Sequence, residues 1–141
     1  MEIAIATNAD IDPILKLQAQ IYRTAKVADK ARNTLEKQMN DNSCNILVAR
    51  KDNDVVATAT IYYIEVAVRA RPYALLEGLV VDKSHRGHGI GTALFEKCIE
   101  IARGKNCYKM IFTSGTDRPD AHKFYEKLGF KRWGLEFRMD L

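Results

Sequence analysis

Short stretches rich in β-branched and aromatic residues punctuate the chain, and several alternate hydrophobic with polar positions. A period of two is typical of a strand with one face on a core, because successive side chains point to opposite sides. Most of these stretches are flanked by turn-forming residues. The predicted strands are Glu2–Thr7, Asn45–Arg50, Val55–Ile64, Tyr73–Asp82 and Cys107–Thr113, with a last strand or hairpin over Phe130–Leu141.

Between these strands, apolar residues recur at every third or fourth position, which is the spacing of a helix face packed on a core. The predicted helices run from Asp10, a candidate N-cap, to Ile21, from Asp29 to Met39, from Ile90 to Arg103 and from Asp120 to Leu128. The resulting order is β-α-α-β-β-β-α-β-α-β, without a repeat or a linker. It predicts an α/β fold, a mixed sheet flanked by helices, in a single domain over residues 1–141.

The composition is that of an ordinary globular domain, with 47% hydrophobic and 28% charged residues in 141. No apolar run approaches the ~18 residues of a membrane span, and the first twenty residues show no secretory signal. The three cysteines, Cys44, Cys98 and Cys107, are scattered and form no Cys-x-x-Cys pair. This argues against a disulfide framework or a zinc site. We therefore expect a cytoplasmic protein with no metal and no membrane partner.

The net charge of +4 makes the chain mildly basic. Its basic residues are interleaved with acidic ones, as in Glu96-Lys97 and Glu126-Lys127. A nucleic-acid-binding domain usually gathers lysine and arginine on one face. The scattered charges therefore disfavour a nucleic-acid partner, while the balance suits a small anionic ligand.

The clearest chemical signal follows the strand Tyr73–Asp82, where Gly87, Gly89 and Gly91 lead into the next helix. Glycines let backbone N–H groups turn toward one point, and a helix N-terminus adds unpaired N–H groups and a positive dipole end. Arg86 adds a cation that can fork onto phosphate oxygens. The spacing fits neither the P-loop nor the dinucleotide fingerprint. The segment indicates an anion site; the alternative is a tight turn that needs glycine only for its geometry.

Two motifs resemble those of one family. Arg86-x-x-Gly89-x-Gly91 is similar to the Gln/Arg-x-x-Gly-x-Gly/Ala signature of the GNAT superfamily of N-acetyltransferases. Ala121-x-x-Phe124-Tyr125-x-x-x-Gly129-Phe130 resembles a second segment of that family, in the same order and about thirty residues downstream. The close resemblance covers residues 75–130, and it implies the GNAT-like acyl-CoA N-acyltransferase fold.

The resemblance also implies an activity. The donor would be acetyl-CoA and the acceptor a primary amine, on a small molecule or on a protein. Transfer would be direct within a ternary complex, because no Cys or Ser stands in a recognisable nucleophile setting. A rival interpretation is a catalytically silent acyl-CoA-binding sensor or interaction module, which would bind the donor without consuming it. A homodimer, through an edge strand or the C-terminal hairpin, is left open.

The family motifs imply which residues bind the coenzyme. Backbone amides from Gly87 to Thr92 would hold the pyrophosphate, and the backbone of the preceding strand would pair with the pantetheine arm. Gly78 indicates a bulge that splays this strand from its neighbour, with close backbone packing as the alternative. Arg118 departs from the family pattern, which often has Asn there. The implied set is Leu79, Val80, Val81, Arg86, Gly87, His88, Gly89, Ile90, Gly91, Thr92 and Arg118.

Transfer to an amine needs a base, because a lysine-like ammonium has a pKa of about 10.4, and an acid for the departing thiolate. Glu77 is the candidate base, since simple alternation puts its carboxylate on one face with Leu75, Leu79 and Val81. The alternative is a solvated or ion-paired glutamate. Tyr125 is the candidate acid, because it matches the family position from which a tyrosine contacts the coenzyme sulfur. The alternative is a core tyrosine.

Several side chains near the predicted strands are candidates for an acceptor pocket. These are Tyr22, Arg23, Tyr62, Tyr63 and Glu65. The alternative is that they are ordinary strand and helix residues.

Overall fold

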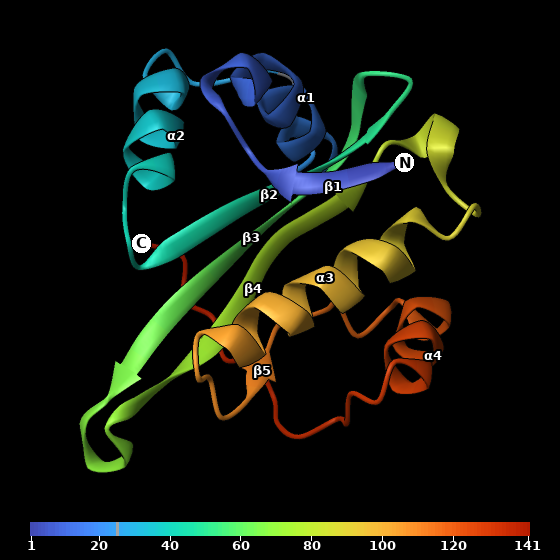
Figure 1. Ribbon diagram of the computed structural model, residues 1–141. Helices are drawn as coiled ribbons and strands as arrows, with labels where there is room; N and C mark the ends of the chain where they lie inside the picture. Colours follow the sequence, from blue (N-terminus) through green and yellow to red (C-terminus); the bar gives the residue numbers. More distant parts are fainter. Residues whose placement is uncertain (25) are drawn as a thin grey trace. The chain divides into compact units, whose positions relative to one another are not determined.

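The computed structural model describes residues 1–24 and 26–141. The chain divides into two compact units, residues 1–111 and 112–141. The first unit holds a five-stranded mixed sheet whose strand order follows the sequence (Figure 1). Its first three pairings are antiparallel and the last is parallel. The strands are β1 (Glu2–Ile5), β2 (Cys44–Lys51), β3 (Asp54–Val66), β4 (Arg71–Val81) and β5 (Met110–Ile111). The predicted α/β fold with a mixed sheet is confirmed.

Helices form where the apolar spacing predicts them. The first unit contains α1 (Ile11–Ile21), α2 (Ala31–Met39) and α3 (Ile90–Gly104), and the second contains α4 (Pro119–Lys127). Asp10 directly precedes α1 as predicted, but its carboxylate does not cap that helix. It accepts hydrogen bonds from the Thr7 backbone N–H at 2.7 Å and from the Arg50 guanidinium at 2.6 Å, so it ties the helix entry to β2.

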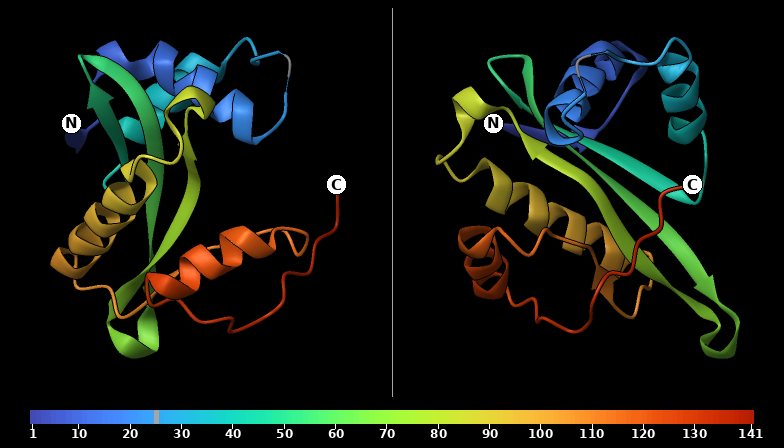
Figure 2. Two further views of the ribbon diagram at one scale, coloured as in Figure 1. Left: turned by 90° about the vertical axis from the view of Figure 1, so that its right-hand side faces the viewer. Right: turned by 180° about the vertical axis from the view of Figure 1, so that it is seen from behind.

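The register assigns each side chain of the sheet to one of two faces, because directly opposed residues of an antiparallel pair share a face. One face, here the α1/α2 face, carries a buried cluster with residues of α1 and α2: Ile11, Ile14, Leu35, Cys44, Ile46 and Val48. Its opposite, the α3 face, is covered by α3, which buries Leu94, Phe95 and Cys98 (Figure 2). The face on which a strand side chain lies therefore tells which helices cover it.

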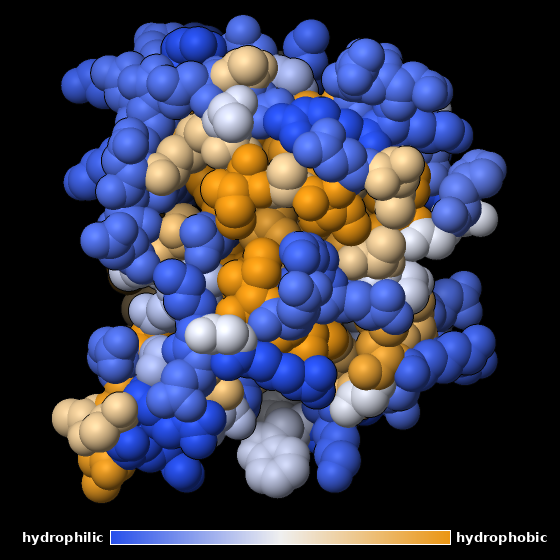
Figure 3. Space-filling model, viewed as in Figure 1, coloured by the Kyte–Doolittle hydropathy of each residue, from blue (hydrophilic) through white to orange (hydrophobic). Residues whose placement is uncertain are grey.

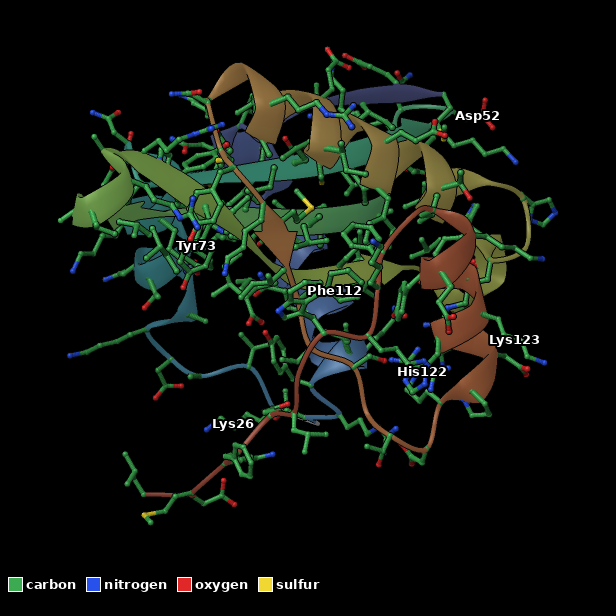
Figure 4. The ribbon with its side chains drawn as sticks, turned by 90° about the horizontal axis from the view of Figure 1, so that it is seen from below. Lys26, Asp52, Tyr73, Phe112, His122 and Lys123 are labelled. Atoms are coloured by element: carbon green, nitrogen blue, oxygen red, sulfur yellow. The ribbon has the colours of Figure 1, made fainter. Side chains whose placement is uncertain are left out.

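Strands β2 to β4 form one antiparallel run, and Asp52 and Tyr73 mark its two ends in Figure 4. Asp52 lies in the β2–β3 turn with φ 51°. Tyr73 lies near the start of β4, and its ring meets that of Tyr108 edge-on at 6.3 Å. The residues of predicted chemistry lie further along β4, toward the Asp52 end of the sheet.

The pairing of β3 with β4 is broken at one point. Ala59 of β3 faces two residues of β4, Gly78 and Leu79, while the pairing on either side is one-to-one. Gly78 has φ +59°, a conformation that glycine adopts without a Cβ penalty. An extra residue on one strand of an antiparallel pair is a β-bulge. The bulge predicted at Gly78 is confirmed.

The end of the chain differs from the prediction. Among the described residues 112–141 no strand forms, so the last strand or hairpin over Phe130–Leu141 is wrong and the observed order ends at α4. Trp133, Leu135 and Phe137 keep the alternating pattern but are 90%, 80% and 90% exposed. Alternation yields a stable strand only when a neighbouring strand pairs with it.

The strand predicted over Cys107–Thr113 is also shorter than expected. It is reduced to the two residues of β5, which pair only with Ala74 and Leu75.

In the hydropathy view of Figure 3, hydrophobic residues show mainly toward the middle of the face and hydrophilic ones surround them. No helix of the described chain is long and apolar enough to cross a membrane.

Candidate functional site

The glycine turn lies between β4 and α3. It begins with a short 3₁₀ turn at Lys83–His85 and continues through Arg86 to Gly89, the N-cap of α3. Gly87 and Gly89 both have φ +80°, and a Cβ built on either would meet nothing within 4 Å. These two glycines are therefore required by the left-handed backbone conformation and not by lack of space.

The backbone amides of residues 87–92 face no acceptor within the described part of the chain. Those of Ile90, Gly91 and Thr92 belong to the first turn of α3, where no intrahelical partner exists. The first internal bond of this helix is made by Ala93, whose N–H donates to the Gly89 carbonyl at 3.1 Å. The turn thus gathers unpaired N–H groups at the positive end of a helix dipole, which is a favourable site for an anion.

Arg86 folds back from the turn onto the end of β4. Its Nε donates a hydrogen bond to the Val81 carbonyl at 2.9 Å, and the side chain is exposed. Because only Nε is used, the terminal nitrogens remain available for phosphate oxygens. His88, the other predicted side chain of the turn, places Nδ1 3.3 Å from the His85 carbonyl oxygen.

Asp82 anchors the turn to its surroundings. Its carboxylate accepts hydrogen bonds from the Ser84 backbone N–H at 3.0 Å and from the Ser84 hydroxyl, and from Gln20 Nε2 of α1 at 2.9 Å. His85 Nδ1 lies 3.4 Å from the same carboxylate. Hydrogen bonds from Ser84 and Gln20 hold the pKa of Asp82 well below its usual range. No sequence motif singled out Gln20.

We expect Asp82→Asn to lower the Tm by a few degrees near pH 7. Because the pKa of the folded-state carboxyl is depressed, its ionisation stabilises the fold above the ordinary pKa of about 3.9 and loses this effect as the pH falls. The gap in Tm between wild type and variant should therefore narrow below about pH 4. Thermal melts from pH 7 to pH 3 measure it, and a gap that stays constant contradicts the role assigned to Asp82.

The bulge changes the face on which β4 side chains lie. Glu77 pairs with Thr60 and Val80 pairs with Thr58, both on the α1/α2 face, whereas Val81 pairs with Ala57 on the α3 face. The expectation that Glu77 shares a face with Leu79 and Val81 is therefore wrong, because an inserted residue reverses the alternation beyond it. Its carboxylate lies on the α1/α2 face, next to the end of α1.

Tyr22, the residue that ends α1, contacts the candidate base. Partial burial raises the pKa of Tyr22, and the charge of Glu77 and a hydrogen bond with its carboxylate raise it further. Its hydroxyl oxygen also lies 3.9 Å from where a Cβ on Gly78 would stand. Tyr22 therefore lies close to Glu77 and the bulge, and its place in an acceptor pocket stays a prediction.

Tyr62 lies on the same face of β3. Its hydroxyl accepts a hydrogen bond from Gln38 Nε2 of α2 at 2.6 Å. Burial raises the pKa of Tyr62, and Cys44, Glu77 and Tyr22 add to the effect. Tyr22 and Tyr62 thus lie near the Glu77 carboxylate on the α1/α2 face. Gln38 carries no sequence signal, because its contact spans 24 positions.

The other candidates for an acceptor pocket lie elsewhere. Tyr63 is on the α3 face, where its hydroxyl donates to Asn45 Oδ1 at 2.6 Å and burial raises its pKa. Glu65, two positions after Tyr63, lies on the same face, and its charge raises the pKa of Cys107. Arg23 is exposed, with φ 52°. The structure therefore brings Tyr22 and Tyr62 to Glu77, but not Tyr63 or Glu65.

The second edge of β4 is free where the coenzyme-binding strand was predicted. β5 pairs only with Ala74 and Leu75, and from Leu76 to Val81 no other strand of the described first unit pairs with this edge. An unpaired strand edge presents N–H and C=O groups that an extended ligand can use. The free edge runs directly into the glycine turn.

Comparison with known proteins identifies the family. A model of the acetyltransferase (GNAT) family matches residues 11–130. This chain belongs to that family. A glucosamine 6-phosphate N-acetyltransferase of Trypanosoma brucei brucei is 46% identical to this GNAT chain over 66 residues, which cover 47% of the chain and 43% of the relative. The chain therefore matches less than half the length of this curated relative.

Solved structures agree with the family. A structure from Agrobacterium tumefaciens str. C58 has a TM-score of 0.92 at 28% identity and covers 100% of both chains. A Trypanosoma brucei acetyltransferase has a TM-score of 0.84 at 26% identity and covers 99% of both. The predicted family and fold are confirmed.

In this GNAT chain the segment that resembles the second family motif, residues 121–130, begins on α4 of the second unit and ends beyond it. Arg118 is the N-cap of α4, and Pro119 occupies the first helical position. The Tyr125 ring packs edge-on against Phe112 at 4.7 Å (Phe112 is labelled in Figure 4), and Phe112 also contacts Phe130 at 4.9 Å. The roles of Arg118 and Tyr125 at the site stay predictions.

The described residues contain no group of three or more His, Cys, Asp or Glu side chains placed to hold a metal ion. Cys44 and Cys98 are buried free thiols, and burial raises the pKa of Cys44 to about 11 and that of Cys98 to about 12. Thiols with raised pKa values are poor nucleophiles. Cys44 and Cys98 therefore give no support to a covalent cysteine intermediate.

Proposed function

We propose that this chain is an acetyl-CoA-dependent N-acetyltransferase, and that its two units act together as one domain. It moves an acetyl group to a primary amine by direct transfer in a ternary complex. The observation that carries this proposal is the placement of Glu77. Its carboxylate stands beside the bulge of a strand whose free edge leads into a turn of unpaired amides.

The residues present fit the donor. The amides of residues 87–92 and the Arg86 guanidinium match a pyrophosphate, and the left-handed Gly87 and Gly89 leave the turn open. The free edge of β4 from Leu76 to Val81 offers backbone groups to the amides of the pantetheine arm. When bound, acetyl-CoA supplies an activated acetyl group as a thioester.

Residues of this chain would carry out the proton transfers and stabilise the charge that develops during acetyl transfer. Glu77 accepts the proton that the amine must lose, directly or through a water molecule. Backbone N–H groups at the bulge, where pairing with β3 is interrupted, stabilise negative charge on the acetyl oxygen. Tyr125 supplies a proton to the departing sulfur. The motif resemblance supports this last role.

Tyr125→Phe should lower turnover by about tenfold or more with a weakly basic acceptor, because general acid catalysis contributes about 10²–10⁴-fold. The phenyl ring preserves the edge-on contact with Phe112, so the fold should be retained. Initial rates of thiol release measure the effect. Full activity in the variant excludes Tyr125 as the acid.

The acceptor is a primary amine of a small molecule or of a protein. One relative is named for glucosamine 6-phosphate, so this amino sugar belongs in a panel with simple amines and peptides. Release of free thiol from acetyl-CoA upon addition of an amine supports the transferase. A catalytically silent acyl-CoA-binding module would bind the donor, release no thiol with any amine, and tolerate changes at Glu77 and Tyr125.

A further inference from the structure

The Tyr62 hydroxyl has one unused hydrogen-bonding function. Its oxygen accepts from Gln38 Nε2 at 2.6 Å, so the hydroxyl hydrogen points elsewhere. Within the described part of the chain no group accepts that hydrogen. A half-buried hydroxyl whose hydrogen is not yet donated, and whose oxygen is fixed by a glutamine of α2, is suited to bind a ligand.

Tyr62 stands next to the candidate base. It pairs with Leu75 on β4, so Glu77 is its diagonal neighbour on the same face, a separation that long side chains bridge. The charge of Glu77 reaches the Tyr62 hydroxyl, and Tyr22 lies near both. The site therefore presents one carboxylate acceptor and one free hydroxyl donor side by side.

These two groups match a particular substrate pattern. The carboxylate accepts an N–H of the amine, and the Tyr62 hydroxyl donates to an oxygen close to that amine. We propose that Tyr62 is a specificity-determining residue that selects vicinal amino alcohols, the class that includes amino sugars. This inference rests on the proposed transferase function, and it adds the acceptor class to it.

The test compares trans-2-aminocyclohexanol with cyclohexylamine, which lacks only the hydroxyl. We expect wild-type kcat/KM to be about tenfold higher for the amino alcohol, the size of effect that one neutral hydrogen bond gives. Tyr62→Phe should reduce this ratio to near one. Tyr63→Phe is the matched control, since Tyr63 is its neighbour on β3 but lies on the α3 face, and it should keep the wild-type ratio.

A second variant tests the role of the Tyr62 hydroxyl without removing it. Gln38→Glu is nearly isosteric, but its carboxylate would accept the Tyr62 hydrogen that wild type leaves free. We expect this variant to lose the preference for the amino alcohol as Tyr62→Phe does. Circular dichroism of both variants should match wild type.

The outcomes separate the two proposals. A wild-type ratio near one, or a ratio unchanged by Tyr62→Phe, overturns the role of Tyr62 while thiol release with both amines still supports the transferase. Thiol release with other amines but with neither of this pair also overturns it. If no amine releases thiol although acetyl-CoA binds, the transferase proposal fails, and the acceptor class fails with it.

Discussion

Replacing Glu77 by Gln is expected to lower turnover by about 10²–10⁴-fold, the range that a general base contributes. Glutamine keeps the size of the side chain and can still accept a hydrogen bond from Tyr22, but it cannot take a proton from the amine. The affinity for acetyl-CoA should stay within about twofold of wild type, because the proposed donor site is the turn and the strand edge and does not include this carboxylate.

Glu65→Gln provides the control. Glu65 is exposed, on the neighbouring strand and on the α3 side of the sheet, so its loss should leave turnover unchanged. The pH–rate profile adds a second readout: Glu77→Gln should remove the limb that follows ionisation of the base. Normal turnover, or an unaltered profile, would show that Glu77 is not the base.

Gly89→Ala is expected to weaken acetyl-CoA binding by about tenfold. Gly89 has φ +80° as the N-cap of α3. A non-glycine residue in the left-handed region costs about 1–2 kcal/mol, so alanine favours another backbone angle and turns the amides of the α3 first turn away from one point. A Cβ there would meet nothing within 4 Å, so steric clash contributes nothing in the free protein.

Gly104→Ala is the matched control in the same helix. Gly104 is the last residue of α3, outside the positive-φ region, and a Cβ there also meets nothing within 4 Å. It should leave donor affinity unchanged and stabilise the fold by about 0.5–1 kcal/mol, because alanine favours the helix. Calorimetric titration and thermal melts measure both effects. Equal donor affinity in Gly89→Ala and wild type would mean that the turn does not hold the donor.

The sequence predicts the sheet well wherever its pattern is local. Strands β2, β3 and β4 lie where the strand-forming stretches put them, within a few residues at each end. The bulge at Gly78 is also predictable, because an isolated glycine inside a strand pattern often marks one. The face on which Val81 lies could not be predicted, because the extra residue in the bulge reverses the alternation of side chains beyond it.

Contacts that join distant elements lie beyond such patterns. The hydrogen bond of Gln38 with Tyr62 and that of Gln20 with Asp82 span 24 and 62 positions. Neither glutamine belongs to a motif, and only the packing of α1 and α2 over the sheet brings them to the site. In Phe130–Leu141, by contrast, the local pattern predicts a strand that does not form, because no strand pairs with it among residues 112–141.

Calorimetric titration with acetyl-CoA is the first test of the proposed donor site, with desulfo-CoA and NAD as controls. We expect binding of both CoA ligands in the micromolar range and no binding of NAD, because the glycine turn is proposed to hold the CoA pyrophosphate beside a free strand edge and lacks the dinucleotide fingerprint. No binding of acetyl-CoA by demonstrably folded protein would mean that the glycine turn is only a turn, and it would contradict the transferase.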